Sequence, residues 1–163
     1  MVVFIFSFVF PVLNLYVLYK LKRLPSLTLS NQADRTFPYI MTSIFYFGLF
    51  YLLRDMNIWA PLKLFILGGG IGILLTALIN LKFKISAHMV GVGGLLGVLM
   101  SLSYLIKFDM TLFYIAAILV AGFIGTSRLY LNEHKPYQLY LGFLLGLLVQ
   151  IGLFFAFEKT NFA

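Results

Sequence analysis

Residues 136–157 read PYQLYLGFLLGLLVQIGLFFAF, a run of apolar residues with no charged side chain. A helix of about 20 such residues crosses the hydrocarbon core of a bilayer. The rest of the chain has the same character, because 62% of its residues are hydrophobic and only 10% are charged. A soluble domain of this size cannot bury so much apolar surface. The sequence therefore predicts an all-α integral membrane protein.

Five further apolar runs precede this one, and together they predict a six-transmembrane-helix bundle. The strict alternation of a membrane β-barrel is absent, and helices are the remaining way to satisfy every backbone polar group within lipid. No cysteine is present, so neither a disulfide nor a thiolate metal site can form. No linker or repeat interrupts the chain, which indicates one domain over residues 1–163. The expected spans lie at about 2–19, 38–53, 61–81, 88–106, 110–126 and 136–157.

Glycines four residues apart recur in three of the runs. The pairs are Gly68 with Gly72, Gly93 with Gly97, and Gly142 with Gly146. Small residues at this spacing let two membrane helices approach closely. We expect these pairs to serve helix packing, and the same faces permit a homo-oligomer or a larger membrane complex.

Six spans place every second connector on the same side of the membrane. Five polar residues fall on that side: Arg35, Ser86, His88, Arg128 and His134. A random scatter over both sides would seldom produce this grouping. Imidazole titrates near neutral pH, and guanidinium offers planar donors that match phosphate. The grouping predicts a site for a phosphate carried on a lipid.

Pro136 predicts the start of the last helix, because proline is favoured in a first helical turn. His134 then lies just before a helix N-terminus, where the dipole and free amides favour an anion. Gln138, in the first turn, is placed to accept a hydrogen bond from the His134 imidazole through its amide oxygen. Such a bond would fix the tautomer of the ring.

The spacing of this last stretch matches a known motif. Ser127-Arg128, five residues, His134, three residues and Gln138 resemble the third motif of the type 2 phosphatidic acid phosphatase superfamily, which has aspartate at the last position. That family has a six-helix membrane core and three sequence motifs.

The two other motifs lie upstream. Ile85-Ser86-Ala87-His88 resembles the second motif, Pro-Ser-Gly-His. The first motif is a lysine, six residues and Arg-Pro; Arg35 matches its arginine, the proline is displaced to Pro38, and Thr28 stands at the lysine position. The resemblance covers residues 28–142, which is most of the chain.

The resemblance implies a membrane-embedded lipid phosphatase that works without a metal or other cofactor. His134 would attack phosphorus and carry a transient phosphohistidine. His88 would protonate the leaving lipid oxygen and then activate water, and Gln138 would hold the His134 ring. The phosphate-binding residues implied are Arg35, Arg128, Ser86, Ser127 and the backbone at Ala87. The substrate would be an isoprenoid pyrophosphate, a phosphatidate-like lipid or a lipid-linked sugar phosphate.

Two other classes of function remain open. Gln138 and Thr28 favour a non-catalytic relative, which binds a lipid phosphate or serves as a structural subunit of a membrane complex. A cytochrome-like subunit would use His88 and His134 as haem ligands, but the adjacent serine and arginines argue against it. Taken singly, the basic residues at helix ends are typical of interfacial anchors.

The net charge is +7, and its distribution bears on orientation. The site side carries Lys20, Lys22, Arg23, Arg35, Lys82, Lys84, Arg128 and Lys135, against Arg54, Lys63, Lys107 and Lys159 on the other. The positive-inside rule places the site side in the cytoplasm, whereas the resemblance implies an extracytoplasmic site in a bacterial inner membrane. Nucleic-acid binding is an unsuitable use of this charge in a chain so embedded in lipid, so the expected partners are the bilayer and a lipid phosphate.

Overall fold

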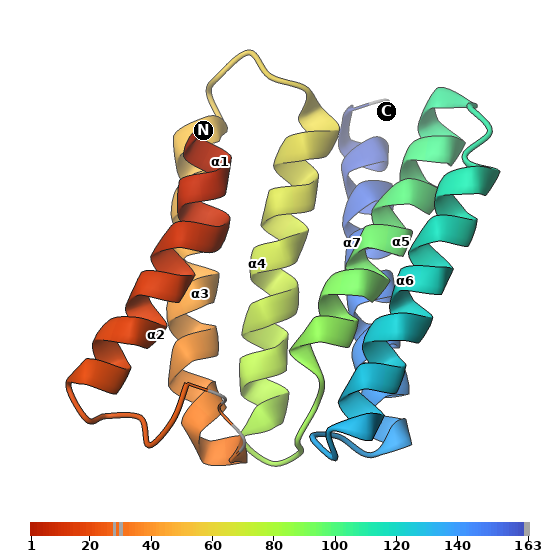
Figure 1. Cartoon of the computed structure of the whole chain (residues 1–163). Coiled ribbons are helices and arrows are strands. Elements are labelled where there is room, and N and C mark those ends of the chain that lie inside the picture. The colour runs from red at the N-terminus through yellow and green to blue at the C-terminus, as the bar shows by residue number, and fades with distance from the viewer. Residues whose placement is uncertain (28, 30, 162–163) are drawn as a thin grey trace.

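A computed structural model describes residues 1–27, 29 and 31–161 of the chain, and the side chains as far as residue 158. Every regular element in this part is helical, and six helices are long and apolar enough to cross a membrane. The protein is therefore an integral membrane six-helix bundle, as predicted. The elements are α1 (Val2–Phe4), the π-helical η1 (Ile5–Val9), α2 (Phe10–Lys20), α3 (Gln32–Leu53), α4 (Ala60–Asn80), α5 (Ala87–Ile106), α6 (Thr111–Tyr130) and α7 (Pro136–Asn161) (Figure 1).

The connectors lie at two opposite ends of the bundle. Those joining α2 to α3, α4 to α5 and α6 to α7 are together at the lower end in Figure 1, and the N-terminus and the other two connectors are at the upper end. This is the sidedness that an even number of spans predicts. We call the lower end the site face, defined by connector residues 21–27, 29, 31, 81–86 and 131–135.

The second span begins earlier than predicted, at Gln32 rather than at Pro38. Asn31 stands at the N-cap in extended conformation, and the start of the helix is tied to α4 by a reciprocal pair of bonds. The Gln32 side chain donates to the Asn80 carbonyl at 2.6 Å, and the Asn80 side chain donates to the Gln32 carbonyl at 2.8 Å. These bonds extend α3 by more than a turn past its proline, so Arg35 lies on the helix and not in the connector.

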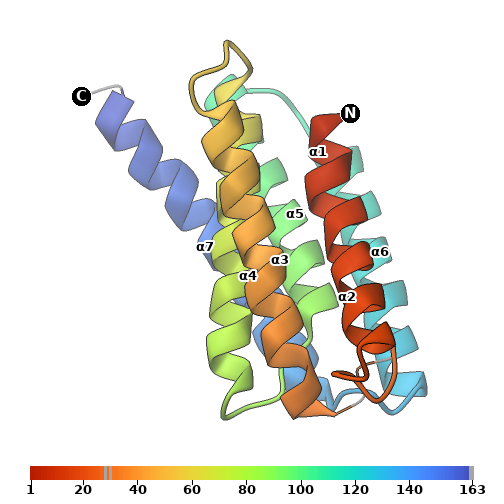
Figure 2. The same ribbon diagram turned by 90° about the vertical axis from the view of Figure 1, so that its left-hand side faces the viewer.

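The closest helix contact joins α5 to α7, where backbone meets backbone. A Cβ on Gly93 would clash with the Phe143 carbonyl, and one on Gly146 would clash with the Val90 carbonyl. At the site end, a Cβ on Gly142 would lie 2.7 Å from the Ser86 carbonyl oxygen. The predicted packing role of these glycines is confirmed, and Figure 2 shows α7 inclined so that it contacts both α5 and α4.

This contact sets the start of α5 against the start of α7. The Ser86 backbone N–H lies 3.4 Å from the Gln138 carbonyl oxygen that accepts it. The residues of the second and third motifs, about 50 positions apart in the chain, therefore meet at the site face.

We predict that Gly146→Ala destabilises the protein by about 1–3 kcal/mol, because the added methyl group forces α5 and α7 apart. The measurement is thermal unfolding in detergent. Gly152→Ala is the matched control on the same helix, where no described atom outside that helix turn lies within 4 Å of the added Cβ. Equal unfolding temperatures for the two variants would contradict the packing role.

Candidate active site

Arg35 is at the centre of the site and is only 5% exposed. Its Nη1 lies 3.0 Å from Nε2 of His134, and its Nη2 donates to Oε2 of Glu133 at 2.8 Å. Its Nε donates to the Leu29 carbonyl. Leu29 has a φ of 52°, a left-handed conformation that a leucine rarely adopts. The guanidinium is therefore held on three sides, with its planar fork directed at a histidine and a carboxylate.

Gln138 fixes the orientation of the His134 ring. The Lys135 backbone N–H donates at 3.0 Å to Oε1 of Gln138, which identifies that atom as the oxygen of the amide. The same oxygen lies 3.2 Å from Nδ1 of His134, so Nδ1 must carry the proton. Nε2 then holds a lone pair, which accepts from Arg35. The tautomer is set from both sides of the ring, as the position of Gln138 predicts.

His134 is 8% exposed and lies just before α7, which begins at Pro136 as predicted. Burial and the charge of Arg35 lower the pKa of His134 from 6.5 to about 4, although Gln138 and Glu133 act in the opposite direction. The imidazole is therefore neutral at pH 7. A neutral ring with its lone pair on Nε2 is the form of histidine that can act as a nucleophile.

A second arginine–histidine pair lies beside the first. Nη2 of Arg128 on α6 is 3.1 Å from Nε2 of His88 on α5. The charge of Arg35 also reaches His88, so the two pairs share one polar region. Two buried donors there have no hydrogen-bond partner among the described residues: Nε of Arg128 and the hydroxyl of Ser86. Unsatisfied buried donors are costly and indicate a place where an acceptor binds.

The remaining predicted site residues are placed differently. Ser127 is exposed, and its hydroxyl donates to the Phe123 carbonyl of its own helix at 2.8 Å. It contributes no contact to the two pairs, because adjacent helix positions face different directions. Ala87 lines a cavity that runs from the site face toward the middle of the membrane. Thr28 lies outside the described residues.

Two site residues were not predicted. Glu133, next to His134 in the chain, binds Arg35, and Nζ of Lys84 lies 3.9 Å from the same carboxylate oxygen. Burial and the charge of Arg35 lower the pKa of Lys84, while Glu133 raises it. In the sequence, only the position of both residues in site-face connectors pointed to the site. The same position is equally typical of charged residues that anchor helix ends at the membrane interface.

A cavity of about 270 Å³ extends from the site into the membrane between α3, α4, α5 and α7. Tyr39 and Tyr46 line it from α3, and Ala87 and Gly94 line it from α5. Gly94 lies seven positions after Ala87 on the helix, which corresponds to a depth of about 10 Å. Gly91 lines the cavity and is exposed, so the cavity opens sideways toward the bilayer. Tyr39 follows Arg35 by one helical turn, so the cavity lies next to the arginine on its membrane side.

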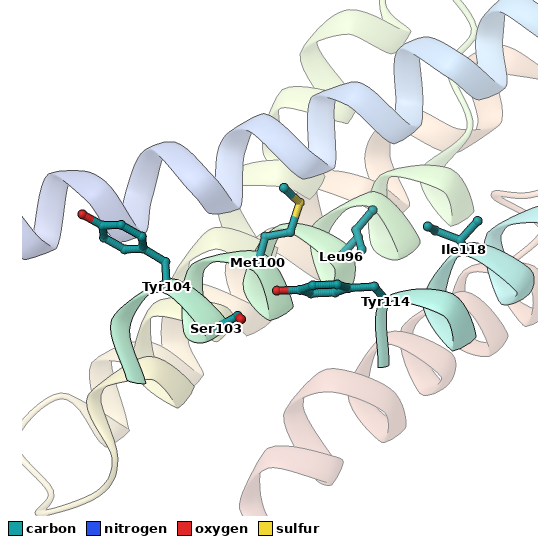
Figure 3. A pocket seen from close by; sticks show the side chains of 6 residues that line it. All are labelled: Leu96, Met100, Ser103, Tyr104, Tyr114 and Ile118. Atoms are coloured by element: carbon teal, nitrogen blue, oxygen red, sulfur yellow. The ribbon is translucent and has the colours of Figure 1, made fainter. Parts of the chain in front are cut away.

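Another groove, of about 420 Å³, lies between α5 and α6 (Figure 3). It is lined by Leu96, Met100, Ser103, Tyr104, Tyr114 and Ile118. These residues belong to the half of α5 remote from His88, and neither histidine nor arginine is among them. This groove therefore lacks the arginine–histidine pairs that are found at the site face.

Comparison of the chain with protein-family models, with curated protein sequences and with solved structures finds no match. The assignment of function accordingly rests on the geometry of the site and on the motif spacing.

We predict that His134 stays neutral, with its proton on Nδ1, down to a pH of about 4. The measurement is the ¹⁵N spectrum of the imidazole groups, recorded on protein purified without a histidine tag and titrated from pH 8 to pH 4. The chain has two histidines, so His88→Asn leaves one signal and gives the assignment. A His134 ring that is protonated at pH 6, or that carries its proton on Nε2, would contradict the geometry.

Proposed function

We propose that the protein is a lipid phosphatase that removes a phosphate or pyrophosphate group from a lipid head group through a phosphohistidine on His134. The observation that carries the proposal is the neutral His134 ring, whose Nε2 lone pair faces the buried fork of Arg35. The resemblance to the type 2 phosphatidic acid phosphatase superfamily supports the same reading, because that family uses the corresponding histidine as its nucleophile.

In the first step, Nε2 of His134 attacks phosphorus, and the bond between phosphorus and the lipid oxygen breaks. Arg128 exchanges its bond to Nε2 of His88 for a bond to phosphate, so His88 can take up a proton from water, and it gives that proton to the departing oxygen. In the second step, a water attacks the phosphohistidine and gives a proton to His88, which releases phosphate and restores both histidines. The ring of His134 is cationic while phosphorus is bound to Nε2, and its Nδ1–H continues to donate to the amide oxygen of Gln138.

The two arginines are suited to hold the phosphoryl group. Guanidinium forms paired, charge-assisted hydrogen bonds with phosphate oxygens. The Nε of Arg128 and the hydroxyl of Ser86 are buried donors that phosphate oxygens would satisfy. Arg35 reaches phosphate by exchanging its bonds to His134 and Glu133 for bonds to oxygen, which frees Nε2 for attack.

The cavity next to Arg35 supports a lipid substrate. Its walls are mostly apolar, it begins one helical turn from the arginine toward the middle of the membrane, and it opens sideways at Gly91. A lipid can therefore place its phosphate at the site face and the first part of one chain in the cavity. We assign the protein to a bacterial inner membrane with its site face extracytoplasmic, following the family, although the basic residues favour the opposite orientation.

A second candidate function is binding without catalysis, as a lipid-phosphate receptor or a structural subunit. Gln138 favours it, because a neutral amide stabilises a cationic imidazole less than a carboxylate does. In serine proteases, the comparable change from aspartate to asparagine lowers kcat about 10⁴-fold. Activity measurements separate the two candidates.

The test is phosphate release by purified protein from a panel of lipid phosphates and pyrophosphates. We expect no release in His134→Ala, a loss of about 10²-fold or more in His88→Ala, and faster release in Gln138→Asp. Release that is absent in wild type and gained in Gln138→Asp would favour the non-catalytic candidate. Release that survives in His134→Ala would exclude the phosphohistidine mechanism.

A second test concerns the cavity. Gly91→Leu fills its lateral opening and should raise the KM of a long-chain lipid phosphate about tenfold, since burial of several methylene groups is lost. Hydrolysis of a short-chain soluble phosphate ester should be unchanged. Gly152→Leu is the control, because both glycines are exposed and have open space at Cβ within the described structure. The same KM for the lipid in both variants would argue against a chain in this cavity.

A further inference from the structure

One carboxylate oxygen in the site lies between two cations. Oε2 of Glu133 is 2.8 Å from Nη2 of Arg35 and 3.9 Å from Nζ of Lys84. The Arg35 side chain is 6% exposed, whereas those of Glu133 and Lys84 are 21% and 22% exposed. The other branch of the Arg35 fork binds Nε2 of His134. The fork thus directs one nitrogen at the nucleophilic atom and the other at an anionic oxygen.

A phosphoryl group attacked by His134 needs the same arrangement. Its phosphorus must approach Nε2, and its oxygens must bind the cations on either side. Carboxylate and phosphate oxygens make the same kind of charge-assisted hydrogen bond with guanidinium and ammonium groups. The position of Oε2 is therefore chemically equivalent to that of a bound phosphoryl oxygen.

We propose that Glu133 holds the place of a phosphoryl oxygen until substrate binds, and that Lys84 is a phosphate-binding residue alongside Arg35. This inference rests on the proposed function, because it assigns the phosphate to the Arg35–His134 pair. Binding then consists of an exchange of anions. The partly exposed Glu133 side chain turns toward water, while the buried Arg35 keeps a negative partner throughout.

The exchange implies a substrate class. A terminal phosphate carries a charge of about −1.5 to −2 and three acceptor oxygens, so it competes well against the single charge of Glu133. A phosphodiester carries one negative charge and gains little by replacing a carboxylate. The cost of displacing Glu133 is the same for both groups, so a terminal phosphate or pyrophosphate group keeps a useful affinity and a phosphodiester head group binds weakly.

The test measures binding rather than turnover. The probes are a single-chain lipid phosphonate, which is not hydrolysed, and its monomethyl ester, which has one negative charge. Wild type should bind the phosphonate more tightly than the ester. Glu133→Gln should tighten binding of both, because neither ligand then has to displace a carboxylate. Lys84→Met should weaken phosphonate binding about tenfold, as expected for one charge-assisted hydrogen bond.

The controls change the same charges outside the cluster. Lys82→Met removes an exposed lysine from the same connector, and Asp34→Asn removes a site-face carboxylate that bonds to Asn31. Both should bind as wild type does. Glu133→Gln leaves Arg35 without its carboxylate and is expected to unfold at a lower temperature. If it fails to fold, Glu133→Asp, which withdraws the carboxylate by one methylene, should change binding in the same direction.

Weaker phosphonate binding in Glu133→Gln, or unchanged binding in Lys84→Met, would overturn the inference. Its failure is distinguishable from failure of the proposed function. If the variants bind the phosphonate as described but the wild type releases no phosphate, the roles of Glu133 and Lys84 stand and the proposed phosphatase activity is wrong. If the wild type releases phosphate but both variants bind the phosphonate as wild type does, the activity stands and the roles of Glu133 and Lys84 are wrong.

Discussion

The backbone contact between α5 and α7 is the constraint on which the site depends. Because Gly93, Gly142 and Gly146 have no Cβ, the two helices approach until carbonyl groups of one lie against the backbone of the other. Helix association in lipid gains nothing from the hydrophobic effect, so close packing of this kind is a principal source of specificity. The contact sets the start of α5 against the start of α7, and both histidines are near these starts. The proposed transfer of a phosphoryl group to His134, with His88 as the acid, depends on the distance that this contact sets.

Electrostatics then define the state of each group. Arg35 is buried and needs a negative partner, which Glu133 supplies. Burial and the charge of the same arginine lower the pKa of His134 and keep the ring neutral, and the amide of Gln138 orders the ring without adding charge. In the resembled family a carboxylate occupies the position of Gln138. In this chain the nearby carboxylate is that of Glu133, and it pairs with Arg35 instead of with the imidazole. A negative charge therefore remains near the His134 ring but does not bind the ring directly.

The sequence was sufficient for the coarse architecture and for the set of polar residues that lie at one end of the bundle. Composition and run length predicted six helices, and their even number placed Arg35, His88 and His134 at one end. The start of α3 was not predictable from Pro38, because a reciprocal pair of bonds between Gln32 and Asn80 extends the helix beyond it.

The direction of individual side chains was the second feature that the sequence did not predict. Ser127 and Arg128 are neighbours in a matching motif, yet one bonds to its own helix and the other reaches His88. Lys84 and Glu133 joined the site through the reach of their side chains, which spacing does not encode. The cavity depends on the mutual register of four helices, and no local pattern specifies that register.

In the proposed mechanism, Nε2 of His134 forms a bond to phosphorus. The most direct measurement is mass spectrometry of the protein quenched in alkali during turnover of a lipid phosphate, conditions under which a phosphorus–nitrogen bond survives. We expect a phosphoryl group on His134 that appears within one turnover and is absent from His134→Ala. Cleavage of the lipid with no phosphoryl group on His134 at any time would contradict it.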